Sequence, residues 1–289
     1  MKKHFDLKGN IEEKVSTGVL LAGFSAIILA SILSIASAQL GMSPLQLVGE
    51  RVLPTYIASI IPGASTGDNL QHYYPENIAV PVGITVAWSN NDPGQPHTVT
   101  SGLENSSDKG SVFNSGIIPF TSLFQYTFSK PGEYVYHCDI HPWRLGKVSV
   151  SDALERGNNL VMTSGTGPNF DLTKNDRTLL VFRPTTITVH ETTPLTYNIT
   201  ITSKDNSTAF SREFFALGND LQLELISTNT TGVSVYGPDF SDPITGTYHA
   251  QGNFLKPNTE YNITAEITAI GSQIPQNTIS DTFVMKVSS

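Results

Sequence analysis

The sequence predicts an all-β protein in which one N-terminal hydrophobic helix precedes two β-sandwiches. Three observations support this fold class. Charged residues make up only 15% of the 289 residues, while Thr, Ser, Asn and Gly are plentiful, and this mixture suits an exported β-protein. Short segments in which apolar and polar residues alternate follow one another after residue 55. No charged residue occurs between Lys14 and Glu50, so this part of the chain is apolar enough for one helix.

Residues 1–38 are predicted to be a signal peptide or a membrane anchor. Residues 1–14 carry four lysines, and the apolar stretch runs from 19 to 36. A stretch of this length suits either purpose, because about 20 apolar residues cross a bilayer. The triplet Ala-Ser-Ala at 36–38 fits a cleavage site, so cleavage and a retained anchor both stay open. In either case the lysine-bearing end stays in the cytoplasm and the rest is exported, with residues 39–55 as a tether.

Sequons for N-linked glycosylation fit this exported setting. The sequence contains five of them, at Asn105, Asn198, Asn206, Asn229 and Asn262.

Residues 56–150 are predicted to form the first β-sandwich. The segment ITVAWS, at 84–89, alternates, with its Ile, Val and Trp on one face. The segment LFQYTFS, at 123–129, alternates in the same way. The Pro-Gly pair at 131–132 marks a turn that opens the strand YVYHC, at 134–138.

Residues 151–176 are predicted to be a linker, because they combine turn residues with little periodicity. Residues 177–289 contain strand-like segments at the spacing of a second sandwich. The segment LKPNTEY, at 255–261, resembles the corner of fibronectin type III domains, where a tyrosine hydroxyl ties a loop to the sandwich edge. This resemblance implies an Ig/fibronectin-III-like β-sandwich. Residues 177–289 contain no catalytic motif, and we expect His190 and His249 to be ordinary surface or packed histidines.

The single cysteine of the chain, Cys138, lies in a pattern that favours a metal site. His141 follows three residues later, so one strand-to-loop transition supplies a thiolate and an imidazole. His97 lies just past the strand at 84–89 and offers a second imidazole. Two neutral imidazoles and one thiolate are the ligands of type 1 copper. Each of these residues alone is more often a buried thiol or a packed histidine, and it is their combination that favours the metal site.

Residues 56–150 resemble a small cupredoxin of the plastocyanin/amicyanin type, in particular the archaeal exported variety. The segments that carry the resemblance are PENIAVPVGITVAWSNND, PHTVTSG, FTSLFQYTFSKPGEYVYHC and CDIHPWRLGKVSV. The resemblance implies a Greek-key β-sandwich of eight strands that holds one type 1 copper through His97, Cys138 and His141. It also implies that the backbone N–H of Thr98 donates a hydrogen bond to the Cys138 sulfur, a contact that tunes the potential.

Arg144 departs from the family pattern, because amicyanin-like members have the axial methionine at this position. Arginine stays protonated and has no lone pair to offer a metal. Three outcomes stay open. The site is three-coordinate with a raised potential, and the carbonyl of Pro96 acts as a weak axial ligand. Alternatively, the position is open and admits water or a small substrate, or the domain is a degenerate cupredoxin with a structural role.

His137 is next to Cys138 and has the opposite strand phase, so we expect it on the outer face of the sandwich. In multicopper oxidases and copper nitrite reductases, a histidine beside the type 1 cysteine holds a second copper. This chain has seven histidines and no cluster of partners, so only a multimer would complete such a site.

The sequence thus predicts an exported, membrane-associated copper protein that carries single electrons, and it favours an electron carrier over an enzyme without deciding between them. His141 is the expected exposed ligand, and Trp143 and Leu145 form the expected docking patch for a redox protein in an extracytoplasmic chain. Two alternatives stay open: a copper enzyme that acts on oxygen or nitrogen oxides at an open position, and a non-redox surface or scaffold protein. The net charge of −8, from 17 basic and 25 acidic residues without a basic run, argues against nucleic acid as a partner.

Overall fold

A computed structural model describes residues 55–289 except residues 70, 191, 219 and 241–245. All regular elements in this part of the chain are β-strands, as the sequence predicts. The predicted N-terminal helix, the cleavage site and the tether up to residue 54 lie outside the described residues. Within the described residues, no helix has the length and hydrophobicity needed to cross a membrane.

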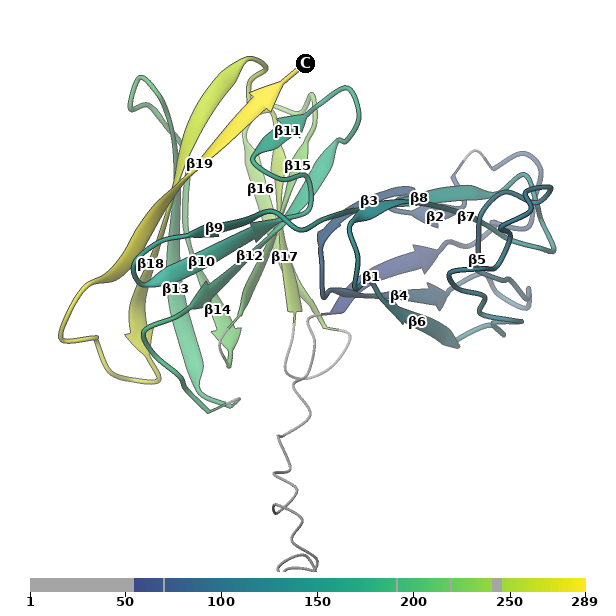
Figure 1. Cartoon of the computed structure of the whole chain (residues 1–289), viewed down its shortest axis with the longest axis horizontal. Coiled ribbons are helices and arrows are strands. Elements are labelled where there is room, and N and C mark those ends of the chain that lie inside the picture. The colour runs from purple at the N-terminus through teal and green to yellow at the C-terminus, as the bar shows by residue number, and fades with distance from the viewer. Residues whose placement is uncertain (1–54, 70, 191, 219, 241–245) are drawn as a thin grey trace, which may run out of the picture. The chain divides into compact units, whose positions relative to one another are not determined.

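The first sandwich consists of two four-stranded sheets (Figure 1). One sheet has the strand order β2-β1-β4-β6 and the other has the order β3-β8-β7-β5. The strands are β1 (Thr55–Ile60), β2 (Tyr73–Tyr74), β3 (Asn77–Pro81), β4 (Thr85–Asn90), β5 (Thr100–Ser101), β6 (Leu123–Thr127), β7 (Gly132–His137) and β8 (Leu145–Ser151).

Trp88 lies at the centre of the first core. The alternation predicted for β4 buries Val86 and Trp88 completely. The Trp88 ring packs against the rings of Phe113, Phe124 and Tyr136, with centroids 5.4–5.9 Å apart. Aromatic pairs at this spacing contribute beyond the area that they bury, so this cluster fixes how the two sheets pack.

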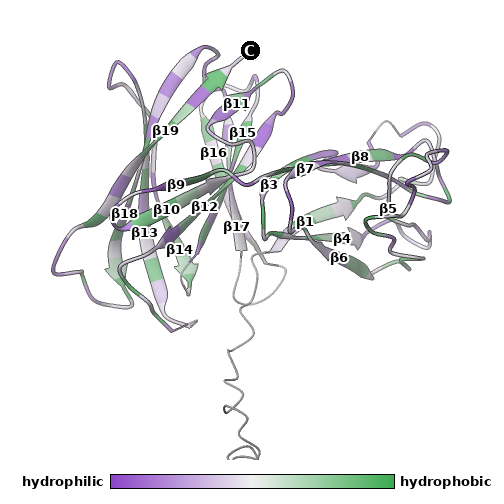
Figure 2. Cartoon of the chain, viewed as in Figure 1, coloured by the Kyte–Doolittle hydropathy of each residue, from purple (hydrophilic) through white to green (hydrophobic). Residues whose placement is uncertain are grey.

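The second sandwich has one sheet with the order β16-β17-β15-β12-β10-β9 and another with the order β11-β19-β18-β13-β14. Hydrophobic and hydrophilic residues mix along its longer strands, as expected where one face is buried (Figure 2). Its strands are β9 (Leu154–Arg156), β10 (Leu160–Ser164), β11 (Asn169–Asp171), β12 (Arg177–Pro184), β13 (Pro194–Ser203), β14 (Thr208–Leu217), β15 (Leu221–Ser227), β16 (Val233–Phe240), β17 (Gly246–Gly252), β18 (Thr259–Ile270) and β19 (Ile279–Ser288).

The linker predicted over residues 151–176 is wrong, because this stretch contains three strands of the second sandwich. β10 pairs antiparallel with β12 and β9, and β11 pairs parallel with β19. Leu160, Met162 and Phe170 belong to the buried core of this sandwich. Each strand is only three to five residues long and is bounded by turns, so too few residues alternate to reveal it in the sequence.

The tyrosine of the predicted corner, Tyr261, is buried at the start of β18. Its hydroxyl accepts a hydrogen bond from the Lys256 N–H at 2.7 Å and donates one to the carbonyl of Phe254 at 3.3 Å. These bonds tie the segment before β18 to the sheet that follows it.

The two sandwiches share buried contacts through β12. Leu179 and Val181 of this strand pack into the core of the first sandwich, whereas Leu180 and Phe182 pack into the core of the second. Both faces of β12 are therefore buried, which explains its nearly continuous run of apolar residues. The sandwiches also share a hydrogen bond, from the Tyr56 hydroxyl to Glu224 at 2.6 Å.

Candidate metal centre

The structure brings His97, Cys138 and His141 together where β4 and β7 end and β8 begins. The Cys138 Sγ lies 3.8 Å from the His97 Nδ1 and 3.6 Å from the His141 Nδ1. Among the described residues, these three form the group of His, Cys, Asp and Glu side chains able to hold a metal ion, with donor atoms within 4.8 Å of one another. Cys138 follows β7 directly, and a tight turn returns His141 towards it, since the His141 N–H donates to the Cys138 carbonyl at 3.1 Å.

The donor atoms fit a metal ion of ordinary bond lengths. Metal–sulfur and metal–nitrogen bonds of about 2.3 Å and about 2.0 Å, at angles of about 110–120°, place the sulfur about 3.5–3.7 Å from each nitrogen. The observed separations of 3.8 Å and 3.6 Å are close to that range. One thiolate with two imidazoles is a soft, mixed donor set that suits copper or zinc.

Cys138 is completely buried and accepts a hydrogen bond from the Thr98 backbone N–H at 3.3 Å. The Thr98 hydroxyl accepts a hydrogen bond from the Asp139 N–H at 2.7 Å, so Thr98 joins the two ligand-bearing segments. Burial raises the pKa of the Cys138 thiol, but His97, the Thr98 N–H and His141 outweigh burial and lower it to about 6. The site therefore favours the thiolate, which is the form that binds a metal.

Asp92 orients the ring of His97. The Asp92 Oδ2 lies 2.9 Å from the His97 Nε2, which leaves the Nδ1 of the same ring facing Cys138. Asp92 also accepts hydrogen bonds from the N–H groups of Gly63, at 2.7 Å, and Ser65, at 3.0 Å. Burial lowers the pKa of His97, but the contacts with Cys138 and Asp92 outweigh burial and raise it. Carboxylates that hold a ligand histidine in this way fix its orientation and increase its basicity.

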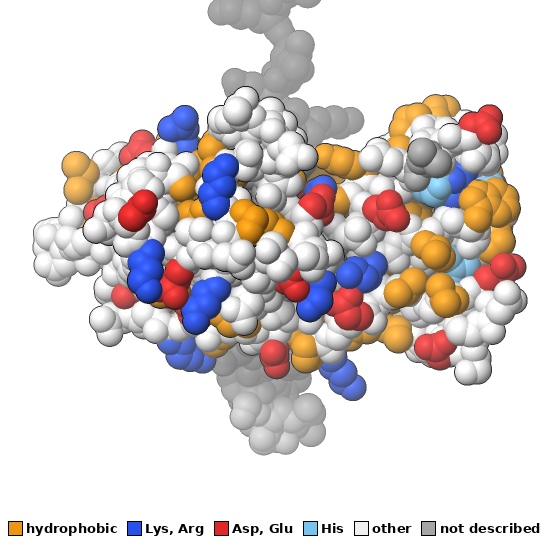
Figure 3. Space-filling model, turned by 90° about the horizontal axis from the view of Figure 1, so that it is seen from above, with side chains coloured by type: hydrophobic (Ala, Val, Ile, Leu, Met, Phe, Trp, Pro, Cys, Tyr) orange, Lys and Arg blue, Asp and Glu red, His pale blue; other side chains and the backbone are white. Residues whose placement is uncertain are grey.

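The His141 side of the site reaches the surface. His141 is partly exposed, and its ring lies edge-on to that of Trp143, with centroids 5.7 Å apart. Trp143 and Leu145, the residues of the predicted docking patch, are 58% and 42% exposed, and Ile140 is 42% exposed. Hydrophobic side chains border the histidines on the surface of this sandwich (Figure 3). The metal centre therefore has an apolar, accessible rim on one side.

Arg144 turns its side chain into the segment at 61–72. It is only 2% exposed, and its guanidinium donates hydrogen bonds to the carbonyls of Asn69, at 2.9 Å, and Thr66. The same group contacts the His72 Nε2. Pro96, whose carbonyl we expect as a weak axial ligand, precedes His97 and is exposed, and its role stays a prediction.

His137 is buried, so the prediction that it lies on the outer face is wrong. Its Nδ1 bonds to the carbonyl of Gly102 at 2.7 Å, and its Nε2 lies 3.3 Å from Asp139. Asp139 pairs in turn with Lys109 at 2.5 Å. Loop residues cover this end of the sheet and enclose the ring, which strand alternation alone does not reveal.

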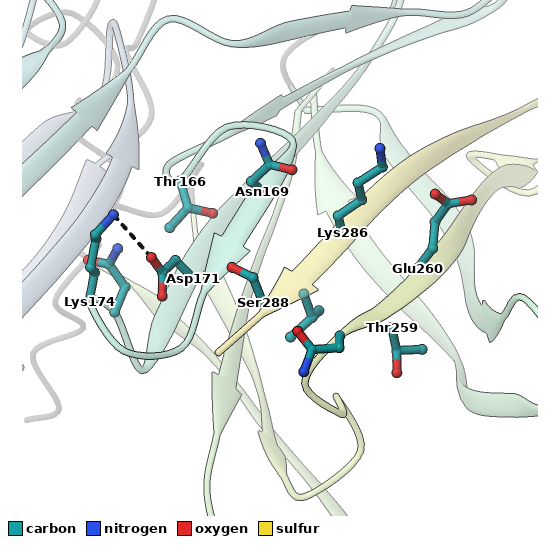
Figure 4. Close-up of a pocket in the computed structure, with 11 residues that line it drawn as sticks. Thr166, Asn169, Asp171, Lys174, Thr259, Glu260, Lys286 and Ser288 are labelled. Atoms are coloured by element: carbon teal, nitrogen blue, oxygen red, sulfur yellow. Dashed lines mark ion pairs between the residues drawn. The ribbon is translucent and has the colours of Figure 1, made fainter.

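The second sandwich carries a polar hollow of about 660 Å³ between β11, β18 and β19. Its charged lining residues are Asp171, Lys174, Glu260 and Lys286, and Lys174 pairs with Asp171 at 3.1 Å (Figure 4). The opposite charges balance, and the lining contains no histidine or cysteine. The metal centre is therefore the stronger candidate for the functional site.

Comparisons with known proteins find relatives for part of the chain. No family model matches it. It is 33% identical over 101 residues to amicyanin from Paracoccus denitrificans, in a match that covers 34% of this chain and 72% of amicyanin. Among solved structures, it is similar to a purple cupredoxin from Nitrosopumilus maritimus, with 36% identity, a TM-score of 0.31, and coverage of 33% of this chain and 98% of that one. An amicyanin variant in the Cu(I) state shows 24% identity and a TM-score of 0.27 and is 82% covered, against 34% of this chain.

Proposed function

The chain belongs to the amicyanin-like cupredoxins through a domain that spans about a third of its length, and from this membership we propose that residues 56–150 hold one copper ion in a type 1 site and exchange single electrons with a partner protein. The observation that carries the proposal is the approach of the Cys138 Sγ to the Nδ1 atoms of His97 and His141. When bound, copper supplies a centre that alternates between two oxidation states.

The residues around the site hold the ligands in place and exclude water. Asp92 fixes the His97 ring, and the Thr98 N–H donates to the Cys138 sulfur. His97 and Cys138 are almost completely buried, so their positions depend on packing and hydrogen bonds within the sandwich. A site that is preorganised in this way reorganises little on electron transfer, which favours rapid exchange.

We infer that electrons enter and leave through His141. It is the ligand with an exposed edge, and Trp143 and Leu145 beside it provide an apolar surface for a transient complex. Redox partners form small interfaces in which orientation matters more than buried area. The proposed partner is a redox protein in an extracytoplasmic chain.

Two features of the chain support this setting. The apolar stretch at 19–36 supports export and attachment to the membrane if it is not cleaved. The Tyr261 corner supports a fibronectin-III-like or Ig-like assignment for the second sandwich, which we propose as the module that presents the copper domain.

The test is the metal content and visible spectrum of the full chain, produced with copper and purified in detergent. We expect one copper per chain and a strong thiolate-to-copper band near ~600 nm. Cys138→Ser should abolish the band, while His190→Ala, which removes an exposed histidine of the second sandwich, should leave it unchanged. Failure of the intact chain to take up copper would favour a non-redox scaffold with a degenerate site.

An enzyme with an open coordination position is the second candidate. Among the described residues, the donor group has three members, and Arg144 directs its charge to the segment at 61–72. Such a site would admit a small ligand beside the metal. Addition of azide to the copper-loaded protein separates the candidates, because a carrier keeps its spectrum and an open enzyme site does not.

A further inference from the structure

Two residues beside the metal centre, Asp92 and Arg144, bond to the same stretch of chain, residues 61–72. Asp92, which holds His97, accepts the N–H groups of Gly63 and Ser65 at 2.7 Å and 3.0 Å. Arg144, three residues after His141, donates to carbonyls further along that stretch. One end of the stretch therefore faces the first histidine ligand, and the other end faces the turn that carries the other two ligands.

The stretch has little regular structure of its own. The Ile61 N–H bonds to the His72 carbonyl at 3.1 Å and closes its base, and two further turn bonds lie inside it. Gly63 has a φ of +82°, a left-handed conformation that favours glycine. Among the described residues between the base positions, none belongs to a strand. Ala64 packs in the first core, and Asp92 and Arg144 are the side chains outside the stretch that bond to its two halves.

Arg144 is well suited to grip the stretch from the ligand turn. Its backbone belongs to that turn, since its N–H donates to the His141 carbonyl at 2.9 Å and its own carbonyl accepts from Cys138 at 3.3 Å. Its side chain reaches the carbonyls of Thr66 and Asn69 with two different guanidinium nitrogens. A planar fork of donors engages several acceptors at once, which the ammonium of lysine cannot do in the same geometry.

We propose that Arg144 is a positioning residue which, through residues 61–72 and Asp92, couples the ligand turn at 138–144 to the orientation of His97. Its guanidinium donates to backbone carbonyls and does not act as a metal ligand. The expected effect on copper binding rests on the proposed function, whereas the coupling itself is a property of the metal-free protein. Coupling between two sites is typically worth about 5- to 150-fold in an equilibrium constant.

The direct test is amide hydrogen exchange of the metal-free full chain in detergent, with the Gly63 and Ser65 amides as reporters. Both donate to Asp92, and neither contacts Arg144. In Arg144→Met we expect their exchange to accelerate at least about tenfold, because the stretch loses the guanidinium that bonds to its carbonyls. The control is Arg212→Met, since Arg212 is exposed on β14 and its guanidinium donates to the neighbouring Ser211 carbonyl. Wild-type protection at both reporters in a folded Arg144→Met variant would overturn the proposal.

Arg144→Lys covers the case in which the methionine variant does not fold. Lysine keeps the charge and loses the fork, so we expect faster exchange than in the wild type at Gly63 and Ser65. Protection equal to that of the wild type in the lysine variant would also overturn the proposal, because charge alone would then suffice. Amides of the second sandwich should keep their protection in both variants.

Copper binding provides the second readout. In copper-loaded protein, Arg144→Lys, which places no thioether beside the metal, should shift the thiolate-to-copper band and weaken copper binding. Combined with Asp92→Asn, the loss of affinity should be smaller than the product of the two separate losses, because both changes release the same stretch. Independent losses that multiply would count against the coupling. Absence of copper binding in the wild type would defeat the proposed function and leave the exchange result intact.

Discussion

The hydroxyl of Tyr56 joins the two sandwiches, and its removal gives a quantitative test of that junction. It donates to Glu224 at 2.6 Å, and both side chains are almost completely buried. Burial and the Glu224 carboxylate hold the pKa of Tyr56 well above its usual value, so the hydroxyl keeps its proton. In Tyr56→Phe, Glu224 keeps the contact with His249 at 2.8 Å and a longer one with Arg177 at 3.7 Å. Loss of one buried hydrogen bond to a charged acceptor should cost about 1.5–3 kcal/mol.

For a unit of this size, that loss corresponds to a decrease of about 3–12 °C in the melting temperature. The assay is urea unfolding of Tyr56→Phe beside Tyr134→Phe, because the Tyr134 hydroxyl makes an exposed bond to the Lys130 carbonyl. The control should stay within about 0.5 kcal/mol of the wild type. Glu224→Gln should cost more than either phenylalanine variant, about 3–5 kcal/mol, because it removes a buried charge and leaves the half-exposed Asp176 as the carboxylate that pairs with Arg177. Equal stabilities of the two phenylalanine variants would refute this account of the junction.

Three further experiments test other parts of the structure. In the metal-free protein, the ultraviolet absorbance of the Cys138 thiolate should titrate with a midpoint of about 6. Because that pKa is lower than the unfolded value of about 8.5, the thiolate should stabilise the fold above pH ~8.5, and this stabilisation should be lost as the pH falls towards 6. A titration midpoint above 8 would contradict the site geometry. Asp281→Ala should cost about 2–4 kcal/mol in urea unfolding, because its carboxylate accepts the backbone N–H groups of residues 158–160, and an unchanged midpoint would count against it. Gly165→Ala should destabilise by about 1–3 kcal/mol or more, because the added Cβ would lie 2.2 Å from the backbone of β3, whereas Gly67→Ala meets nothing within 4 Å and should be neutral.

The sequence predicts the strands that alternate over five or more residues and misses the shorter ones. β18 shows regular alternation of buried and less buried residues, so its pattern is visible without the structure. β4 alternates in its sequence, although Ala87 on its other face is buried as well. β9 and β11 are three residues long, and their pairing with distant strands determines their conformation. Long-range pairing is a property of the folded chain that local periodicity does not encode.

The approach of His97, Cys138 and His141 to one another was predictable, because two of these candidate ligands lie on one turn and the third follows a clear strand. The partners of those ligands were not. Asp92 lies five residues before His97, and this spacing was an available signal, but its bonds to Gly63 and Ser65 depend on the path of an irregular stretch. The burial of His137 depends in the same way on loop residues such as Lys109 and Gly102.

Arg144 illustrates most clearly what the structure adds. From the sequence alone, Arg144 stands where the family has its axial methionine, and the consequences that the sequence predicts all concern the metal. A guanidinium at 2% exposure is costly unless it has acceptors, and here Thr66, Asn69 and His72 provide them. Asn69 is partly buried, so its carbonyl would in turn lack a donor without Arg144, and an unsatisfied buried group costs about 1–3 kcal/mol. Arg144 and the stretch at 61–72 therefore stabilise each other, so we expect replacement of Arg144 by methionine to alter the support of His97 as well as the surroundings of the metal.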